Sequence, residues 1–244
     1  MLATLVEPLV DLVLPRECAG CERPGEVWCA TCRDTLEPCS TRLGSLPVVA
    51  AGAYDGDVRR ALLAYKERRR RDLARPLGRA LGATIGPLLE QAGLGPAQAL
   101  IVCVPSAPAA AARRGGDHVV RLASHAARVG GVRVARGLLR IRPDVLDSAG
   151  LTAAGRARNL SGAMQVARCA PAGARSAIVL DDIVSSGATV LEATRALRAA
   201  GWPVAGAVAL AATPAAGSGA AVQWQHGVAQ WHRHFSRAPL APPR

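Results

Sequence analysis

Residues 177–189 read Ala-Ile-Val-Leu-Asp-Asp-Ile-Val-Ser-Ser-Gly-Ala-Thr, and this stretch decides the fold. Its apolar start predicts a buried strand that delivers two adjacent carboxylates, Asp181 and Asp182. A loop of small residues follows, and residues 187–200 have the pattern of a helix. A strand, a glycine-containing loop and a helix in this order are typical of a parallel α/β sheet, where ligands bind beyond the carboxyl ends of the strands.

The chemistry of this stretch points to a phosphorylated ribose. Adjacent carboxylates repel each other unless they meet hydroxyls, a cation or a metal ion, and a vicinal diol with bound magnesium would satisfy Asp181 and Asp182. The residues expected to surround a phosphate are Ser185, Ser186, Gly187, Ala188 and Thr189. Their backbone N–H groups can approach a phosphate closely, and the helix adds the positive end of its dipole. A strand followed by a capped helix is the simpler alternative, but it leaves the two acids unexplained.

The same alternation of strand and helix patterns extends through residues 48–213. It predicts an open, doubly wound α/β domain with four to six mainly parallel strands. The expected strands are 48–54, 99–104, 132–139, 176–181 and 204–211. The expected helices are one that starts near residue 57, and then 72–91, 117–129 and 187–200.

The 244 residues divide into three zones. Residues 1–47 are expected to form an amphipathic helix and a small cysteine-rich module, 48–213 the α/β domain, and 214–244 a tail rich in Ala, Pro and Gly. A metal site is the alternative for the Trp and His residues of that tail. No apolar run reaches the roughly 18–20 residues of a membrane span. No export signal is evident, and the seven cysteines favour a reducing, cytoplasmic location.

Four of the cysteines form two C-x-x-C pairs, Cys18 with Cys21 and Cys29 with Cys32, separated by seven residues. A tight turn brings the first and fourth residues of each pair together, so four thiolates can complete a tetrahedral zinc site. Redox-active or unliganded thiols are the alternatives. Four sulfur ligands leave no open position on the metal, so the predicted role is structural.

The net charge is +12, from 30 basic and 18 acidic residues. Such a field favours polyanions, namely nucleic acid or phosphate-rich small molecules. The excess is concentrated in one cluster, which comprises Arg59, Arg60, Lys66, Arg68, Arg69, Arg70 and Arg71. This cluster is either a solvated helix face or a surface for phosphate or nucleic-acid contact, and both interpretations stay open.

Residues 177–189 resemble the signature of type I phosphoribosyltransferases, which has four apolar residues, two acids, two apolar residues, two Thr or Ser, Gly, any residue and Thr. Together with the cysteine pairs ahead of it, the chain is similar to the ComF family over residues 9–212. The resemblance implies a type I phosphoribosyltransferase fold with a small amino-terminal zinc-knuckle module. It also implies that Asp181 and Asp182 engage the ribose hydroxyls of phosphoribosyl diphosphate, with magnesium, and that Ser185–Thr189 hold its 5-phosphate.

Other segments resemble the same family. Residues 54–66 resemble its first helix, with a basic residue at Lys66. Arg113 and Arg114 lie in a loop that faces the diphosphate in the family, although two arginines can equally be a solvated loop. Arg156 lies in a segment similar to one that closes over the site. The chain departs from the family at residues 116–118, where Gly, Asp and His replace a bulky aromatic residue, Asn and Gln.

Two functions follow from the resemblance. The first is a magnesium-dependent phosphoribosyltransferase whose acceptor is unidentified, with Asp181, Asp182 and Arg156 as catalytic residues. The second is a non-catalytic accessory of DNA uptake in natural transformation, which binds single-stranded DNA and a ComFA-like helicase partner. The net charge favours the second function. The 3% share of aromatic residues argues mildly against it, because single-strand binders stack bases on aromatic side chains.

Overall fold

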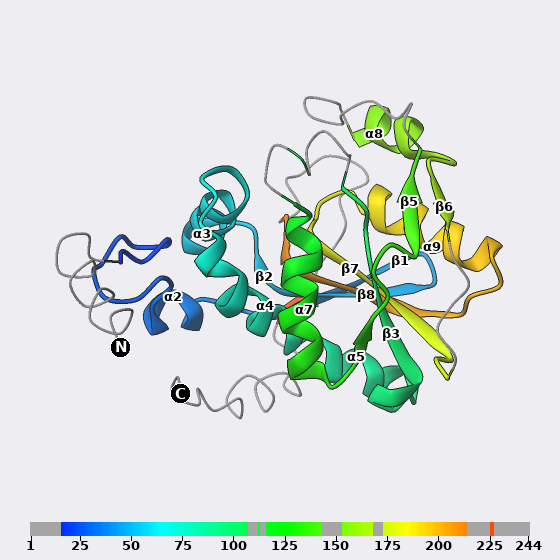
Figure 1. Ribbon diagram of the computed structural model, residues 1–244, viewed down its shortest axis with the longest axis horizontal. Coiled ribbons are helices and arrows are strands. Elements are labelled where there is room, and N and C mark those ends of the chain that lie inside the picture. Colours follow the sequence, from blue (N-terminus) through cyan, green and yellow to red (C-terminus); the bar gives the residue numbers. More distant parts are fainter. Residues whose placement is uncertain are drawn as a thin grey trace, which may run out of the picture.

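The computed structural model describes residues 16–106, 112, 116–142, 153–167, 173–213 and 225–226. A seven-stranded sheet with the order β4-β3-β7-β8-β2-β1-β9 forms its centre (Figure 1). The strands are β1 (Cys39–Leu43), β2 (Leu46–Ala53), β3 (Ala99–Cys103), β4 (Arg133–Val134), β7 (Ser176–Val184), β8 (Val204–Ala212) and β9 (Gln225–His226). All pairs from β4 to β2 are parallel, and β1 runs antiparallel to β2 and β9. The predicted, mainly parallel α/β sheet is confirmed.

Helices cover both faces of the sheet because its strands are apolar on both sides. One face packs against α3 (Gly56–Glu67), α4 (Ala74–Gly82), α5 (Ile85–Ala92) and α7 (His118–Gly130). The other packs against α9 (Ala188–Ala199) and a separate ladder of β5 (Leu139–Ile141) and β6 (Met164–Val166). Along β3, Ile101 belongs to the first core and its neighbours Leu100 and Val102 to the second. This alternation decides which layer each strand residue meets.

The amino-terminal segment with α2 (Ala30–Asp34) lies beside α3 at one end of the molecule, and α8 (Ala153–Leu160) lies with β5 and β6 at the far end (Figure 1). Trp28 is fully buried and joins the segment to the helical core. Residues 39–43, placed in the amino-terminal module by the sequence, form β1 of the main sheet. The predicted helix at the amino terminus and the Trp/His tail fall outside the described residues, apart from β9.

Two expected elements are wrong. The single helix over 72–91 is divided into a 3-10 turn (Arg71–Leu73), α4 and α5. Pro87 in α5 has no N–H for the carbonyl of Ala83, so one continuous helix cannot form there. The strand over 132–139 is also divided, because Gly137 turns the chain at φ +67° and sends β5 into the separate ladder with β6.

No helix within the described residues is both long and apolar enough to cross a membrane. The strand expected over 176–181 continues to Val184. Asp181 and Asp182 therefore lie inside β7, where Asp181 pairs with Ala209 of β8, and not in the loop that follows it. Strand geometry, rather than loop geometry, directs their side chains.

Candidate functional site

Two acidic side chains lie buried near the carboxyl end of β7, between β3 and β8. Asp181 is 9% exposed and Asp182 is 4% exposed. Successive side chains of a strand point to opposite faces of the sheet. Asp182 reaches residues of α3 and α7, whereas Asp181 is in register with Ala209, whose side chain belongs to the core on the α9 side. The two neighbours therefore meet different surroundings.

Asp182 is held by cations and donors from two helices. Lys66 Nζ, in the last turn of α3, lies 2.9 Å from its Oδ2. His118 Nε2, at the first residue of α7, lies 2.6 Å from the same oxygen. Burial disfavours the carboxylate, but the hydrogen bond from His118 and the charge of Lys66 outweigh it and hold the pKa of Asp182 well below its usual range.

Asp181 has no such pair of partners among the described contacts. Burial and the nearby charge of Asp182 raise its pKa to about 7, against a smaller opposing effect of the Asp182 backbone N–H, which donates to Asp181 Oδ1 at 2.8 Å, and of Lys66. Two adjacent carboxyl groups thus have pKa values that are pushed in opposite directions. A separation of this kind is a mark of sites that bind or transform charged ligands.

The loop after β7 turns into α9 at a glycine that packs closely against β1. Gly187 adopts φ +76° and is the N-cap of α9, and an added Cβ there would lie 2.3 Å from Leu43 Cδ1. Ser185 and Ser186 are half-buried before it, and Ala188 and Thr189 open the helix. The first backbone N–H groups of a helix have no carbonyl partner within it and favour anions.

His118 is the site residue that the sequence interpretation missed. In the sequence it stands out only as a departure from a family pattern, yet α7 follows β3, the strand beside β7. In a parallel sheet the helix that follows each strand begins at the carboxyl edge. The position of a histidine directly after the helix-capping residue Asp117 therefore indicates a side chain at this edge of the sheet.

The structure brings Lys66 to Asp182, which lies far from it in the sequence. Arg113 and Arg114 fall outside the described residues. Arg156 belongs to α8, but its side chain is not among those described. The predicted contacts of Arg113 and Arg114 with a diphosphate stay predictions, as does the predicted catalytic role of Arg156.

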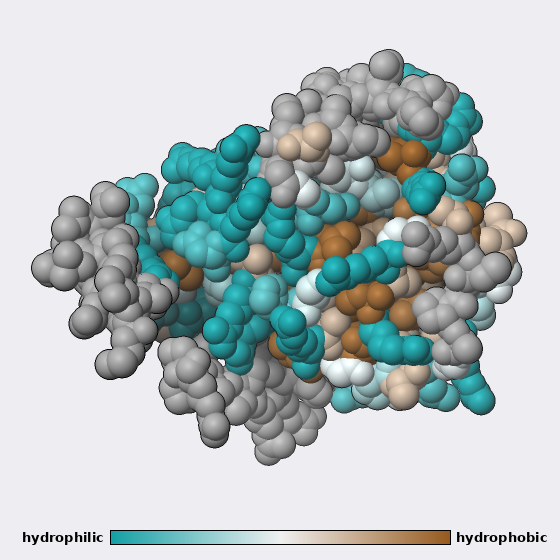
Figure 2. Space-filling model, viewed as in Figure 1, coloured by the Kyte–Doolittle hydropathy of each residue, from teal (hydrophilic) through white to brown (hydrophobic). Residues whose placement is uncertain are grey.

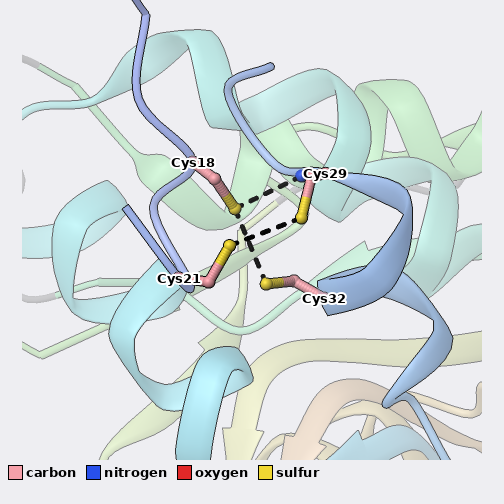
Figure 3. A group of neighbouring side chains, drawn as sticks. All are labelled: Cys18, Cys21, Cys29 and Cys32. Carbon is pink, nitrogen blue, oxygen red and sulfur yellow. Dashed lines mark hydrogen bonds between the residues drawn. The ribbon is translucent and has the colours of Figure 1, made fainter. Parts of the chain in front are cut away.

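The four cysteines of the C-x-x-C pairs form a cluster, and their sulfur atoms all lie within 4.8 Å of one another (Figure 3). Cys18 Sγ is 3.6 Å from Cys32 Sγ, and Cys21 Sγ is 3.6 Å from Cys29 Sγ. Zinc–sulfur bonds of about 2.3 Å place tetrahedral sulfur ligands about 3.8 Å apart. The cluster can therefore hold a metal ion such as zinc.

The surroundings of the cluster favour the thiolate form of Cys18 and disfavour that of Cys32. Burial disfavours the Cys18 thiolate, but the backbone amides of Cys29, Cys21 and Gly20 outweigh it and lower its pKa to about 6. The Cys29 amide donates to Cys18 Sγ at 3.3 Å. Cys32 Sγ lies 2.9 Å from Asp57 Oδ2 of α3, and burial together with that carboxylate raises its pKa. All four thiols are free.

The remaining cysteines do not add to the cluster. Cys39 and Cys103 are buried free thiols in β1 and β3, and burial raises the pKa of Cys39 to about 12. Cys169 falls outside the described residues. Comparison of the chain with protein-family models and with curated proteins gives no match.

Proposed function

We propose that the protein has a type I phosphoribosyltransferase fold and binds phosphoribosyl diphosphate with magnesium at the carboxyl edge of its sheet. One observation carries the proposal: two buried, adjacent carboxyl groups at the end of a central strand lead directly into a small-residue loop and a helix N-terminus. A ribose with two hydroxyls and a 5-phosphate supplies donors for the acids and an anion for the loop.

The reaction consistent with this ligand is transfer of the phosphoribosyl group. The bond from C1 of the ribose to the diphosphate oxygen breaks, the bond from C1 to the acceptor forms, and the acceptor releases its proton to solvent while diphosphate leaves. Magnesium, when bound, would neutralise charge on the diphosphate. Positive charge develops on the ribose ring in the transition state, and the ionised Asp182 supports it electrostatically. Arg113, Arg114 and Arg156 are the proposed cations for the leaving diphosphate.

Binding is the first test. Titration calorimetry with magnesium and phosphoribosyl diphosphate should give saturable binding to the wild type. Asp182→Asn should weaken it by about tenfold or more, because an amide replaces a charged hydrogen-bond acceptor. Glu90→Gln is the matched control, since it neutralises an exposed acid at the end of α5. No saturable binding to the wild type would reject the proposal.

Turnover is tested separately. Wild-type protein is incubated with labelled phosphoribosyl diphosphate, magnesium and a panel of bases, nucleosides and nucleic acids, and diphosphate release is measured. Acceptor-dependent release that Asp182→Asn abolishes would support transfer. Binding without release for any acceptor would reject the catalytic part and leave a ligand-binding protein.

We also propose that the four-cysteine cluster holds one structural zinc ion. The sulfur spacing and the free thiols support it. Elemental analysis of purified protein should find one zinc per chain. Cys32→Ser should lose the metal, whereas Cys39→Ser, a buried cysteine in β1, should keep it. Full metal content in Cys32→Ser would contradict the assignment.

Binding of single-stranded DNA is the second candidate function, and the distribution of charge favours it. Neither α4 nor α7 contains an acidic residue, and Arg75 and Arg128 are exposed beside His125, whose pKa is lowered by burial and by both arginines. Hydrophilic residues gather over α3 and α4 (Figure 2). Part of the basic cluster at residues 59–71 already pairs with acidic side chains, because Lys66 contacts Asp182 and Arg70 contacts Asp72.

A salt series distinguishes this candidate. Binding of a labelled single strand should weaken steeply as salt rises, because phosphate contacts release counterions. Arg75→Ala/Arg128→Ala should flatten the slope if the α4–α7 face binds, and Arg68→Ala/Arg69→Ala/Arg71→Ala should flatten it if the loop after α3 binds. Absence of salt-dependent binding below micromolar would reject this function.

A further inference from the structure

We propose that His118 is a positioning residue of the ligand site, which holds the carboxylate of Asp182 in one orientation so that its Oδ1 oxygen serves the ligand. The inference rests on the proposed function, since it names what prepares Asp182 for a ribose hydroxyl. His118 does not touch the ligand in this scheme. It acts through Asp182, and Lys66 acts with it.

The hydrogen bonds accepted by the two carboxylate oxygens of Asp182 support this role. A carboxylate oxygen accepts about two hydrogen bonds. Both Lys66 Nζ at 2.9 Å and His118 Nε2 at 2.6 Å lie against Oδ2 of Asp182. Oδ2 is therefore occupied, and neither contact uses Oδ1. A ligand hydroxyl that reaches Asp182 is therefore expected to donate to Oδ1, which neither Lys66 nor His118 contacts.

The ring of His118 is held in the tautomer that this contact needs. An ionised carboxylate brings no hydrogen, so Nε2 must donate. Nδ1 is buried and has no hydrogen-bond partner among the described residues. A proton on Nδ1 in place of Nε2 would leave a buried N–H without an acceptor and would lose the contact with Asp182. Both effects favour the Nε2–H tautomer.

The backbone of His118 is anchored from several directions. The Tyr65 hydroxyl donates to the His118 carbonyl at 2.8 Å. Asp117 Oδ1 caps α7 by accepting from the amides of Val119 at 2.9 Å and Val120 at 3.4 Å, and it also accepts from Ser106 Oγ at 3.3 Å. The histidine thus projects from a fixed helix start. Rigid support of this kind is what keeps a binding group in its productive geometry.

The contact with Asp182 also distinguishes His118 from a histidine that only fills space in the core. Its partner is Asp182, the acid of the proposed ligand motif. His118 belongs to α7, whereas Lys66 belongs to α3. Without His118, Lys66 would be the remaining described partner of Asp182, and its flexible side chain is able to follow the carboxylate as it rotates. The expected loss is therefore one of orientation, and it should appear in ligand affinity.

The binding arm of the test compares two replacements. His118→Leu keeps an apolar bulk without a donor, and His118→Gln keeps an amide donor. With magnesium and phosphoribosyl diphosphate, His118→Leu should weaken the Kd by about tenfold or more, and His118→Gln should stay within about threefold of wild type. His125→Gln is the control, because His125 lies on the same helix beside Arg128 and has no contact with Asp182 among the described contacts. Equal affinity of His118→Leu and wild type would overturn the proposal.

The second arm needs no ligand. Nitrogen-resolved NMR of the histidine rings should show His118 as the Nε2–H tautomer, and Asp182→Asn should shift its ring resonances while those of His125 stay in place. An unchanged His118 spectrum in Asp182→Asn would overturn the pairing. If the wild type binds no phosphoribosyl diphosphate, the proposed function fails, and this arm still decides whether His118 holds Asp182.

Discussion

At the scale of single residues, the adjacent acids Asp181 and Asp182 show how one peptide bond separates two electrostatic environments. Strand geometry turns them to opposite faces. Asp182 meets Lys66 and His118 on the helical side. Among the described contacts Asp181 has no pair of this kind, and burial together with the charge of Asp182 raises its pKa to about 7. One acid is therefore stabilised as a carboxylate, and its neighbour is not.

Replacing each acid by its amide should change stability in opposite directions. The folded-state pKa of Asp181, about 7, lies above its ordinary value of 3.8, so its ionisation destabilises the folded protein progressively as pH rises between these values. Asp181→Asn should raise the free energy of unfolding at pH 8 by about 1–3 kcal/mol, with little effect near pH 4. Denaturant unfolding at both pH values measures this, and a lower stability of Asp181→Asn at pH 8 would contradict it.

Asp182→Asn is expected to behave in the opposite way. The pKa of Asp182 is lowered in the folded protein, so its contribution is present above about pH 4 and is lost as pH falls below that value. Removing its charge leaves Lys66 and His118 without their partner and should cost about 3 kcal/mol at pH 7. In the same unfolding experiment, a stability equal to that of the wild type at pH 7 would show that the contacts of Asp182 do not stabilise the fold.

At the scale of elements, the connection from β7 to α9 depends on Gly187. Its φ of +76° is unfavourable for other residues, and the space for a side chain is taken by Leu43 of β1. The loop that is proposed to hold a phosphate is thereby pressed against the antiparallel strand of the sheet. The turn therefore needs glycine for two separate reasons, its positive φ and the lack of space for a side chain beside Leu43.

Two glycine-to-alanine variants separate those reasons. Gly201 follows α9 at φ +79° with nothing within 4 Å of an added Cβ, so Gly201→Ala should cost only about 1 kcal/mol of backbone strain. Gly187→Ala adds a clash with Leu43 and should cost about 1–3 kcal/mol more. Thermal unfolding of the two variants compares them directly. Equal losses would show that Leu43 moves aside without cost.

At the scale of the whole molecule, α3 joins the four-cysteine cluster to the carboxylate site. Its first turn places Asp57 against Cys32, and Arg60 bonds both Asp57 and the carbonyl of Gly20. Its last turn carries Lys66 to Asp182. We therefore expect that a disturbance at one end of this helix of 12 residues reaches the other end.

Removal of a bound metal should destabilise the amino-terminal segment and weaken ligand binding together. With magnesium kept in excess, a zinc-selective chelator should lower the Tm. The emission of the buried Trp28 should shift to longer wavelength as water reaches it, because thiolate–metal bonds replace a core in so small a segment. Trp28→Phe identifies the signal, and zinc should restore the wild type. Ligand affinity that is unchanged after chelation would show that α3 does not couple the two sites.

The sequence predicted most of the elements that surround the site. Strand 176–181, the helix at 187–200 and the cysteine pairs were recognisable because apolar runs, a glycine loop and C-x-x-C spacing are local features. The helix over 72–91 failed because Pro87 interrupts it. The strand over 132–139 failed because the turn at Gly137 sends its second half to another ladder, a choice that depends on the partner strand β6.

By itself the sequence determined that two carboxylates stand before a small-residue loop and that four cysteines are spaced for one metal ion, because both patterns lie within a few residues of chain. Only the tertiary structure decided that Lys66 and His118 meet at one oxygen of Asp182. Those residues come from α3 and α7, and no periodicity in the chain links them. Their meeting depends on how two helices pack over one face of a parallel sheet, and that packing separates the roles of Asp181 and Asp182.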